Sequence, residues 1–210
     1  MRIAIIGVGN VGSGFGRAAV HAGHDVVLSA AHPERAQSAA AEIGAAAAES
    51  NTAAVAGAQA VVLAVPGSQA PAVAAEIASS LAPGAVLIDA TNPLNETYSD
   101  LAVEGTSGAE DVHNRAGGAP VVKAFNTVFA SRYGNATENG EPLQVLLAGD
   151  DAAAKGTVAE IASSLGFTAL DAGGLRQARS LEEMAFLNIV LNASKGWSWQ
   201  SAWQLVGPTE

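Results

Sequence analysis

Short apolar runs alternate along the chain with segments whose apolar residues recur at helical spacing. The run Arg2–Gly7 (RIAIIG) is β-branched and ends in glycine, the pattern of a strand buried on both faces. The next segment, Asn10–Ala22, places Val11 and Phe15 on one helical face and is followed by Gly23, a residue that ends helices. This alternation predicts an α/β protein with helices on both faces of a mostly parallel sheet.

The same alternation continues to the C-terminus. Further strands are predicted over Asp25–Ser29, Ala45–Ala48, Ala60–Val65, Ala85–Asp89, Pro120–Ala124, Leu143–Ala148 and Thr168–Asp171. Further helices are predicted over His32–Glu42, Ser50–Ala56, Ala70–Leu81, Ser107–Ala116 and Asp151–Leu165. A last helix is expected to be capped by Ser180, with Glu182 and Glu183 in its first turn, and to run to Asn192 or on to Leu205. The longer form would place Trp199 and Trp203 on one helical face.

A GxGxxG motif (GVGNVG) lies between the first predicted strand and the first predicted helix. In that position Gly7 permits a tight turn, Gly9 lets the backbone approach a pyrophosphate, and Gly12 lets the helix pack closely on the sheet. Unpaired amides at the helix start attract the anion. We therefore expect a Rossmann-type, doubly wound dinucleotide-binding domain over residues 1–172. Residues 173–210 are expected to form a short helical cap or dimerisation segment.

The end of the second predicted strand bears on the choice of nucleotide. NAD sites usually place a carboxylate there, whereas this chain reads Ser29-Ala30-Ala31-His32. A 2′-phosphate would meet no repulsion, Ser29 could donate to it, and Arg35 and His32 could supply positive charge. This favours NADP(H) over NAD(H), although Arg35 could equally be a solvated helix charge and His32 an ordinary loop residue.

The amino-acid composition argues against several other classes of function. Only 14% of the 210 residues are charged, against an average near 25%, and the net charge is −10 with ten Lys and Arg. This argues against nucleic acid and anionic membranes as partners. The chain has no Cys, and its four His show no metal-ligand spacing, so no metal site is expected. Polar residues interrupt every long apolar stretch, and we expect a cytoplasmic protein.

Several segments together are similar to those of the coenzyme F420-dependent NADP oxidoreductases, part of the 6-phosphogluconate-dehydrogenase-like Rossmann group. They are Met1–Gly12 (MRIAIIGVGNVG), Val61–Pro66 (VVLAVP), Leu87–Asn92 (LIDATN), Val121–Thr127 (VVKAFNT), Leu146–Asp150 (LLAGD), Phe167–Leu175, Arg179–Glu182 and Leu187. The chain departs from the archaeal pattern at Ala30, where an Arg is usual, and at Val8, where a Thr is usual. The tryptophan-rich tail also lies outside the pattern.

The resemblance implies a hydride transfer between NADP(H) and coenzyme F420 as second substrate, and a homodimer. It implies a pyrophosphate loop of Gly7, Val8, Gly9, Asn10, Val11 and Gly12, and a 2′-phosphate site at Ser29, Ala30 and Arg35. It places Ala64, Val65 and Pro66 beside the nicotinamide, and Asn92, Pro93 and Ala124–Asn126 at the catalytic cleft.

Such a reaction needs no protein nucleophile, because the cofactors carry the chemistry. Asn126 and Arg179 are candidates for positioning the acceptor, Arg179 alternatively forming a salt bridge to Glu182 or Glu183. Lys123 could donate a proton to an imine or carbonyl acceptor, or be structural. Two alternatives remain open: an NADPH-dependent reductase of another small acceptor, such as a flavin, quinone or imine, and a non-catalytic module that senses NADP(H).

Overall fold

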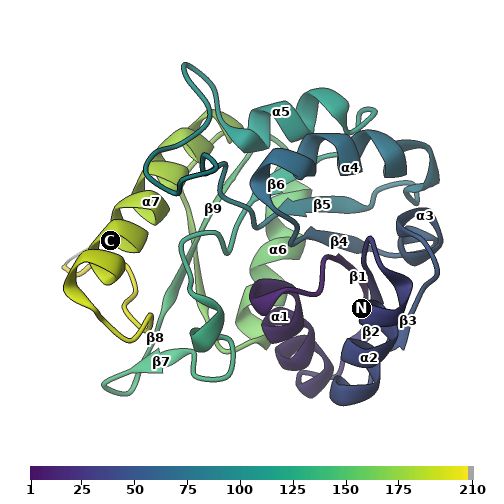
Figure 1. The fold of residues 1–210 in the computed structure, drawn as a ribbon, viewed down its shortest axis with the longest axis horizontal. Coiled ribbons are helices and arrows are strands. Elements are labelled where there is room, and N and C mark those ends of the chain that lie inside the picture. The colour runs from purple at the N-terminus through teal and green to yellow at the C-terminus, as the bar shows by residue number, and fades with distance from the viewer. Residues whose placement is uncertain (208–210) are drawn as a thin grey trace.

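Eight strands form one sheet in the order β3-β2-β1-β4-β5-β6-β9-β10 in the computed structural model, which describes residues 1–207. The strands are β1 Arg2–Ile6, β2 Asp25–Ser29, β3 Ala46–Ala47, β4 Ala60–Leu63, β5 Val86–Asp89, β6 Val121–Lys123, β9 Gln144–Gly149 and β10 Thr168–Asp171. The first six are parallel to one another, and β9 pairs antiparallel with β6 while β10 runs parallel to β9. Figure 1 shows helices on both faces of this sheet.

Seven α-helices are present in the described part of the chain. They are α1 Asn10–His21, α2 Pro33–Ile43, α3 Asn51–Val55, α4 Ala70–Ile77, α5 Gly108–Arg115, α6 Ala152–Ser164 and α7 Ala178–Lys195. Successive strand residues point to opposite faces, so each face has its own core. Ile3, Ile5 and Leu28 belong to the core under α1, α2 and α6, whereas Ile6 and Val27 belong to the core under α3, α4 and α5. Both faces of the sheet are thus buried, which explains the uninterrupted apolar strands.

The predicted Rossmann-type, mostly parallel α/β fold is confirmed. Several element boundaries differ from the prediction. β4 ends at Leu63, before the predicted Val65, and α4 ends at Ile77, before the predicted Leu81. α7 begins at Ala178, before the predicted cap at Ser180, and a hairpin of β7 (Thr137–Glu138) and β8 (Glu141–Pro142) was not predicted. The hairpin strands have two residues each and are exposed, so they leave no hydrophobic pattern in the sequence. No helix within residues 1–207 is long and apolar enough to cross a bilayer.

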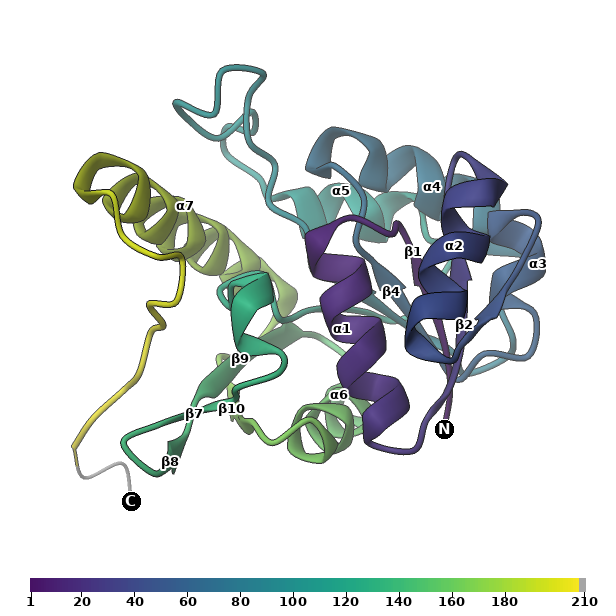
Figure 2. The ribbon, with the colours of Figure 1, turned by 60° about the horizontal axis from the view of Figure 1, so that its bottom comes forward.

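The prediction that the last helix could run on to Leu205 is wrong. It ends at Lys195, because Gly196 adopts a left-handed conformation with φ of 64° that reverses the chain. Residues 197–207, which we call the C-terminal strap, then run back along α7 without helical structure (Figure 2). Trp199 and Trp203 therefore do not share a helical face. The last three residues of the predicted segment 173–210 lie outside the described residues.

We predict that Gly12→Ala destabilises the fold whereas Gly9→Ala does not. A Cβ at Gly12 would overlap the carbonyl of Gly7 and lie 3.2 Å from the Cβ of Ala64. Overpacking of this kind costs about 1–3 kcal/mol. A Cβ at Gly9 would meet nothing within 4 Å, and the φ of −71° suits alanine. Urea denaturation of both variants measures the difference, and equal free energies of unfolding would contradict the prediction.

Candidate functional site

The glycine loop lies where the strand order reverses between β1 and β4. This switch point is where open α/β sheets bind ligands, at the carboxyl ends of the strands. Gly7 has a φ of 104°, and a Cβ there would overlap the carbonyl of Ala64. The tight turn and the close helix–sheet contact predicted for Gly7 and Gly12 are therefore confirmed. The space beside Gly9 is open, as the approach of a pyrophosphate to the start of α1 requires.

Ser29, at the end of β2, does not present the free hydroxyl that the sequence predicted for a 2′-phosphate. Its side chain is buried, and its hydroxyl donates to Oδ1 of Asn51 over 2.9 Å, so the proton predicted to go to a 2′-phosphate is already used. His32 and Arg35 are exposed just beyond the strand, and Nδ1 of His32 lies 3.7 Å from the carboxylate of Glu34. Arg35, in the first turn of α2, supplies a permanent positive charge at this edge.

A cavity of about 1350 Å³ opens beside α1. Four residues predicted for the site line this cavity: Asn10, Val11, Asn92 and Asn126. Tyr98, Phe129 and Trp199 line it as well. Pro93 and Ala124 were predicted at the cleft, but both are buried and neither lines the cavity. Ala64, Val65 and Pro66 follow β4 beside the glycine loop and lie outside the cavity wall.

Asn126 joins two distant segments beneath the cavity. Its Nδ2 donates to Oδ1 of Asn92 and to the carbonyl oxygen of Leu181, each over 3.0 Å, while Nδ2 of Asn92 donates to the carbonyl oxygen of Asn126. Because a carbonyl only accepts, the bond to Leu181 fixes which end of the amide is Nδ2. Oδ1 of Asn126 is buried and has no hydrogen-bond partner within residues 1–207. Asn126 therefore ties α7 to the floor of the cavity.

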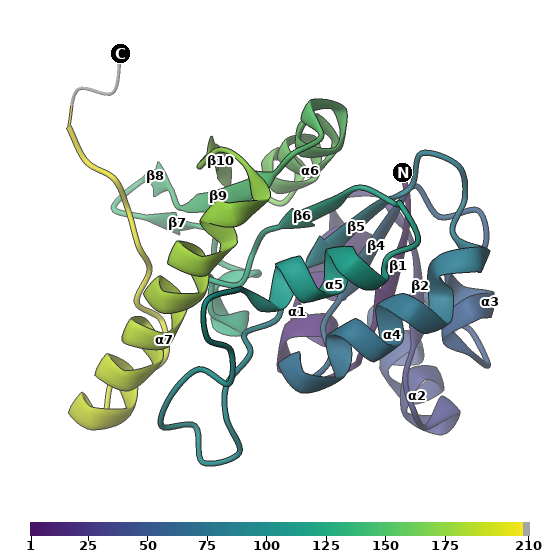
Figure 3. The ribbon, with the colours of Figure 1, turned by 90° about the horizontal axis from the view of Figure 1, so that it is seen from above.

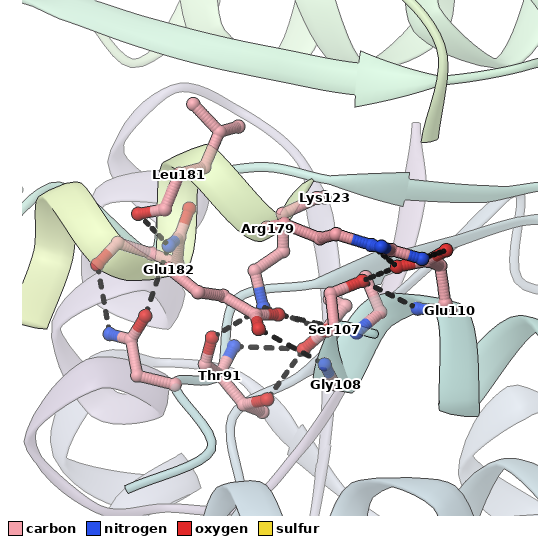
Figure 4. A network of polar contacts seen from close by, with 12 residues as sticks. Thr91, Ser107, Gly108, Glu110, Lys123, Arg179, Leu181 and Glu182 are labelled. Atoms are coloured by element: carbon pink, nitrogen blue, oxygen red, sulfur yellow. Dashed lines mark hydrogen bonds and ion pairs between the residues drawn. The ribbon is translucent and has the colours of Figure 1, made fainter. Parts of the chain in front are cut away.

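A buried ion cluster holds the same region together (Figure 4). Nζ of Lys123, at the end of β6, donates to Oδ2 of Asp89 over 2.9 Å and to the carbonyl oxygen of Thr91 over 2.7 Å. It lies 2.7 Å from Oε1 of Glu182, and all three ionic side chains are fully buried. All three ammonium protons have an acceptor, and Lys123 does not line the cavity. Of the two predicted alternatives for Lys123, these contacts support the structural role and not the proton donor.

The amino-terminal end of α5 stabilises the negative charge of Glu182, the second carboxylate of this cluster. Amides of Gly108 and Ala109 donate to Glu182 over 3.0 and 3.3 Å, at the positive end of the helix dipole. Burial favours the neutral form of Lys123, but the two carboxylates outweigh it and raise its pKa. Burial also raises the pKa of Glu182, and Lys123 opposes that shift. Since α7 begins at Ala178, the dipole that acts on Glu182 belongs to α5 and not, as predicted, to its own helix.

Arg179 lies away from the cavity, which does not support its predicted role in positioning an acceptor. Its Nε and one terminal nitrogen each donate over 2.7 Å to the carboxylate of Glu110 on α5. The predicted alternative, an ion pair within its own helix, is also wrong. The guanidinium bond lowers the pKa of Glu110. Arg179 thus adds a second link between α5 and α7.

The cluster leaves no signal in the sequence, because Asp89, Lys123 and Glu182 are separated by 34 and 59 residues and only the fold brings them together. A different feature of the site did leave a signal. Gly14 and Gly16 are energetically unfavourable within a helix, which indicates close contacts at those positions. A Cβ at Gly14 would lie 3.2 Å from Ala130, beside the cavity, and one at Gly16 would lie 3.0 Å from Ile43 of α2. The described residues contain no group of three or more acidic, His or Cys side chains able to hold a metal ion.

Comparison with known proteins points in one direction. Residues 2–93 match the profile of the family described as NADP oxidoreductase, coenzyme F420-dependent. The chain is 33% identical to the F420-dependent NADP reductase of Methanothermobacter thermautotrophicus, over 91% of this chain and 89% of that protein. A solved structure of a provisional F420-dependent NADP reductase from Arthrobacter sp. FB24 superposes with a TM-score of 0.85 and 30% identity, over 98% of this chain and 100% of that chain.

A further match is partial. The rat metalloreductase STEAP3 is 38% identical over 99 residues, which is 47% of this chain but only 20% of that protein. A solved imine reductase from Myxococcus stipitatus superposes with a TM-score of 0.70 over 93% of this chain and 63% of that chain, but at 18% identity it shares the fold alone.

We predict that Lys123→Met lowers the free energy of unfolding by about 3–5 kcal/mol, because two buried carboxylates lose their counter-charge. Lys155→Met is the matched control. Lys155 also pairs with a carboxylate, over 2.8 Å, but its partner Asp171 is 56% exposed. Loss of such a pair costs about 1 kcal/mol or less. Urea denaturation of both variants measures the contrast, and similar losses would show that Lys123 is not the key charge.

Proposed function

The chain belongs to the family of coenzyme F420-dependent NADP oxidoreductases, and we propose that it transfers a hydride between NADPH and coenzyme F420. The observation that carries this proposal is the large cavity along α1, whose lining includes Asn10 and Val11 of the glycine motif. Pockets for one small ligand usually measure about 300–1,000 Å³, whereas this cavity measures about 1350 Å³. A space of this size beside a dinucleotide loop suits two ring systems held against each other.

The residues of the glycine loop and the end of β2 fit the pyrophosphate and the 2′-phosphate of NADP(H). The open space at Gly9 and the free amides at the start of α1 would receive the pyrophosphate. Arg35 and His32 would contact the 2′-phosphate, while Ala30, partly buried between them and β2, leaves room without adding charge. No carboxylate stands at the end of β2, which favours NADP(H) over NAD(H).

When bound, the nicotinamide and the deazaflavin supply the hydride donor and acceptor. The task left to the protein is to hold the reacting carbons about 3–3.5 Å apart and to limit water around them. Asn10 and Val11 form one wall of the cavity, and Asn92 forms part of its floor. Asn126 acts as a positioning residue, since it fixes Asn92 against α7. None of these residues needs to give up or take a proton.

We also propose that the protein is a cytoplasmic homodimer that associates through α7. The face of α7 turned away from the sheet is apolar: Leu187 is 49% and Val190 40% exposed, and Met184 and Phe186 border a shallow pocket of about 420 Å³ with them. Contiguous apolar surface of this kind is typical of a protein–protein contact. Figure 3 shows α7 standing apart from the helices that cover the sheet.

We predict rapid oxidation of NADPH by oxidised coenzyme F420, and slower oxidation of NADH, followed by absorbance. Arg35→Ala should raise the KM for NADPH about ten- to a hundredfold, because one charge-assisted contact to the 2′-phosphate is worth roughly 1.5–3 kcal/mol. The KM for NADH should stay unchanged, which makes NADH the internal control. Tight NADPH binding with no transfer to F420 would refute the proposed acceptor. Equal rates with the two nucleotides would refute the choice of NADP(H).

We predict that Leu187→Glu converts the dimer into a monomer, because the new charge would be buried at the interface. Leu205→Glu is the control, since Leu205 is 57% exposed on the strap. Sedimentation velocity gives the mass of each variant. A wild-type protein that sediments as a monomer, or a Leu187→Glu variant that remains dimeric, would rule out this interface.

A further inference from the structure

The C-terminal strap is fastened to α7 by a polar network. Nδ2 of Asn192 donates to Oγ of Ser201, and that hydroxyl donates to Oδ1 of Asn188, both over 2.7 Å. Asn188 and Asn192 are 5% and 0% exposed, so this network is largely withdrawn from water. The indole nitrogen of Trp203 donates to the carbonyl oxygen of Met184 over 2.9 Å. The strap therefore has one defined course along the helix.

This network holds Trp199 in an unfavourable backbone conformation. Its φ is 58°, in the left-handed region that bulky residues rarely adopt. The amide of Trp199 donates to Oδ1 of Asn192 over 3.2 Å, and its carbonyl oxygen accepts the hydroxyl of Ser131. Strain of this kind persists where the surroundings enforce it, and it concentrates at ligand-binding sites. Both sides of the Trp199 backbone are thus fixed, while the residue itself stays 44% exposed.

Trp199 lines the same cavity as Asn10, Asn92 and Asn126, although it is more than 70 residues away from each. Its ring packs against that of Phe129, another cavity residue, with centroids 5.4 Å apart and planes at 79°. The two rings form a right-angled aromatic corner. Trp197, by contrast, is 48% exposed and does not line the cavity.

We propose that Trp199 is the residue that selects a planar, conjugated hydride acceptor, whose ring packs in the corner formed with Phe129. A flat aromatic ring gains from contact with both a face and an edge, whereas a small aliphatic imine or ketone would leave most of this surface uncovered. The inference rests on the proposed function for the identity of the ring, coenzyme F420. The corner itself is independent of that identity.

The first test compares Trp199→Ala with Trp197→Ala in steady-state kinetics. Trp199→Ala should raise the KM for F420 about ten-fold, the scale of one aromatic ring contact, and leave the KM for NADPH within two-fold. Trp199→Phe should recover most of the loss, and Trp197→Ala should behave as the wild type. Circular dichroism melting checks that each variant is folded. An unchanged KM for F420 in folded Trp199→Ala, or an equal rise in Trp197→Ala, would overturn the inference.

The second test reads binding without turnover. The chain has three Trp, so the double variant Trp197→Phe, Trp203→Phe leaves Trp199 as the single fluorophore. Titration with oxidised F420 should quench its emission in a saturable way. If F420 neither binds nor accepts hydride, the proposed function has failed, and the same protein is titrated with FMN. Quenching by FMN would keep Trp199 as a ring-binding residue, and quenching by neither ring would overturn it.

Discussion

The ammonium group of Lys123 is the constraint on which the architecture of the site depends. It bonds to β5 through Asp89, to the following loop through Thr91 and to α7 through Glu182. Burial removes water from charged groups, and this cost is offset only when each buried charge has well-placed ionic and hydrogen-bond partners. The amides at the start of α5 complete that match for Glu182. With β6, which carries Lys123, five segments thus meet at one point, and displacement of any of them would remove a partner from a buried charge.

The position of α7 in turn determines the shape of the cavity. Glu182 is followed along the helix by Asn188 and Asn192, which fasten the strap, and is preceded by Leu181, which holds Asn126. The amino-terminal half of α7 therefore positions the floor of the cavity, and its carboxyl-terminal half positions the aromatic corner of Trp199 and Phe129. The buried side of α7 carries three polar residues, Glu182, Asn188 and Asn192, which make hydrogen bonds to other segments, whereas Leu187 and Val190 on its outer side are apolar.

The arrangement suits a reaction in which the protein supplies geometry rather than a reactive side chain. The glycine loop lies at the switch point of the sheet, and part of the opposite wall of the cavity comes from the C-terminal third of the chain. Lys123, which the sequence suggested as a possible proton donor, is committed to three acceptors. The order of the site thus comes from buried polar contacts, in keeping with family members that exchange hydride between two bound cofactors.

The sequence by itself determined the parts of this protein that depend on local order. Apolar periodicity predicted the alternating strands and helices, and the spacing of Gly7, Gly9 and Gly12 predicted the dinucleotide loop, because steric fit within a few residues requires those residue types. Only the tertiary structure decided the roles of Lys123, Arg179 and Trp199. Their partners Glu182, Glu110 and Phe129 lie 59 to 70 residues away, and nothing in local propensity specifies which distant charge or ring a side chain will meet.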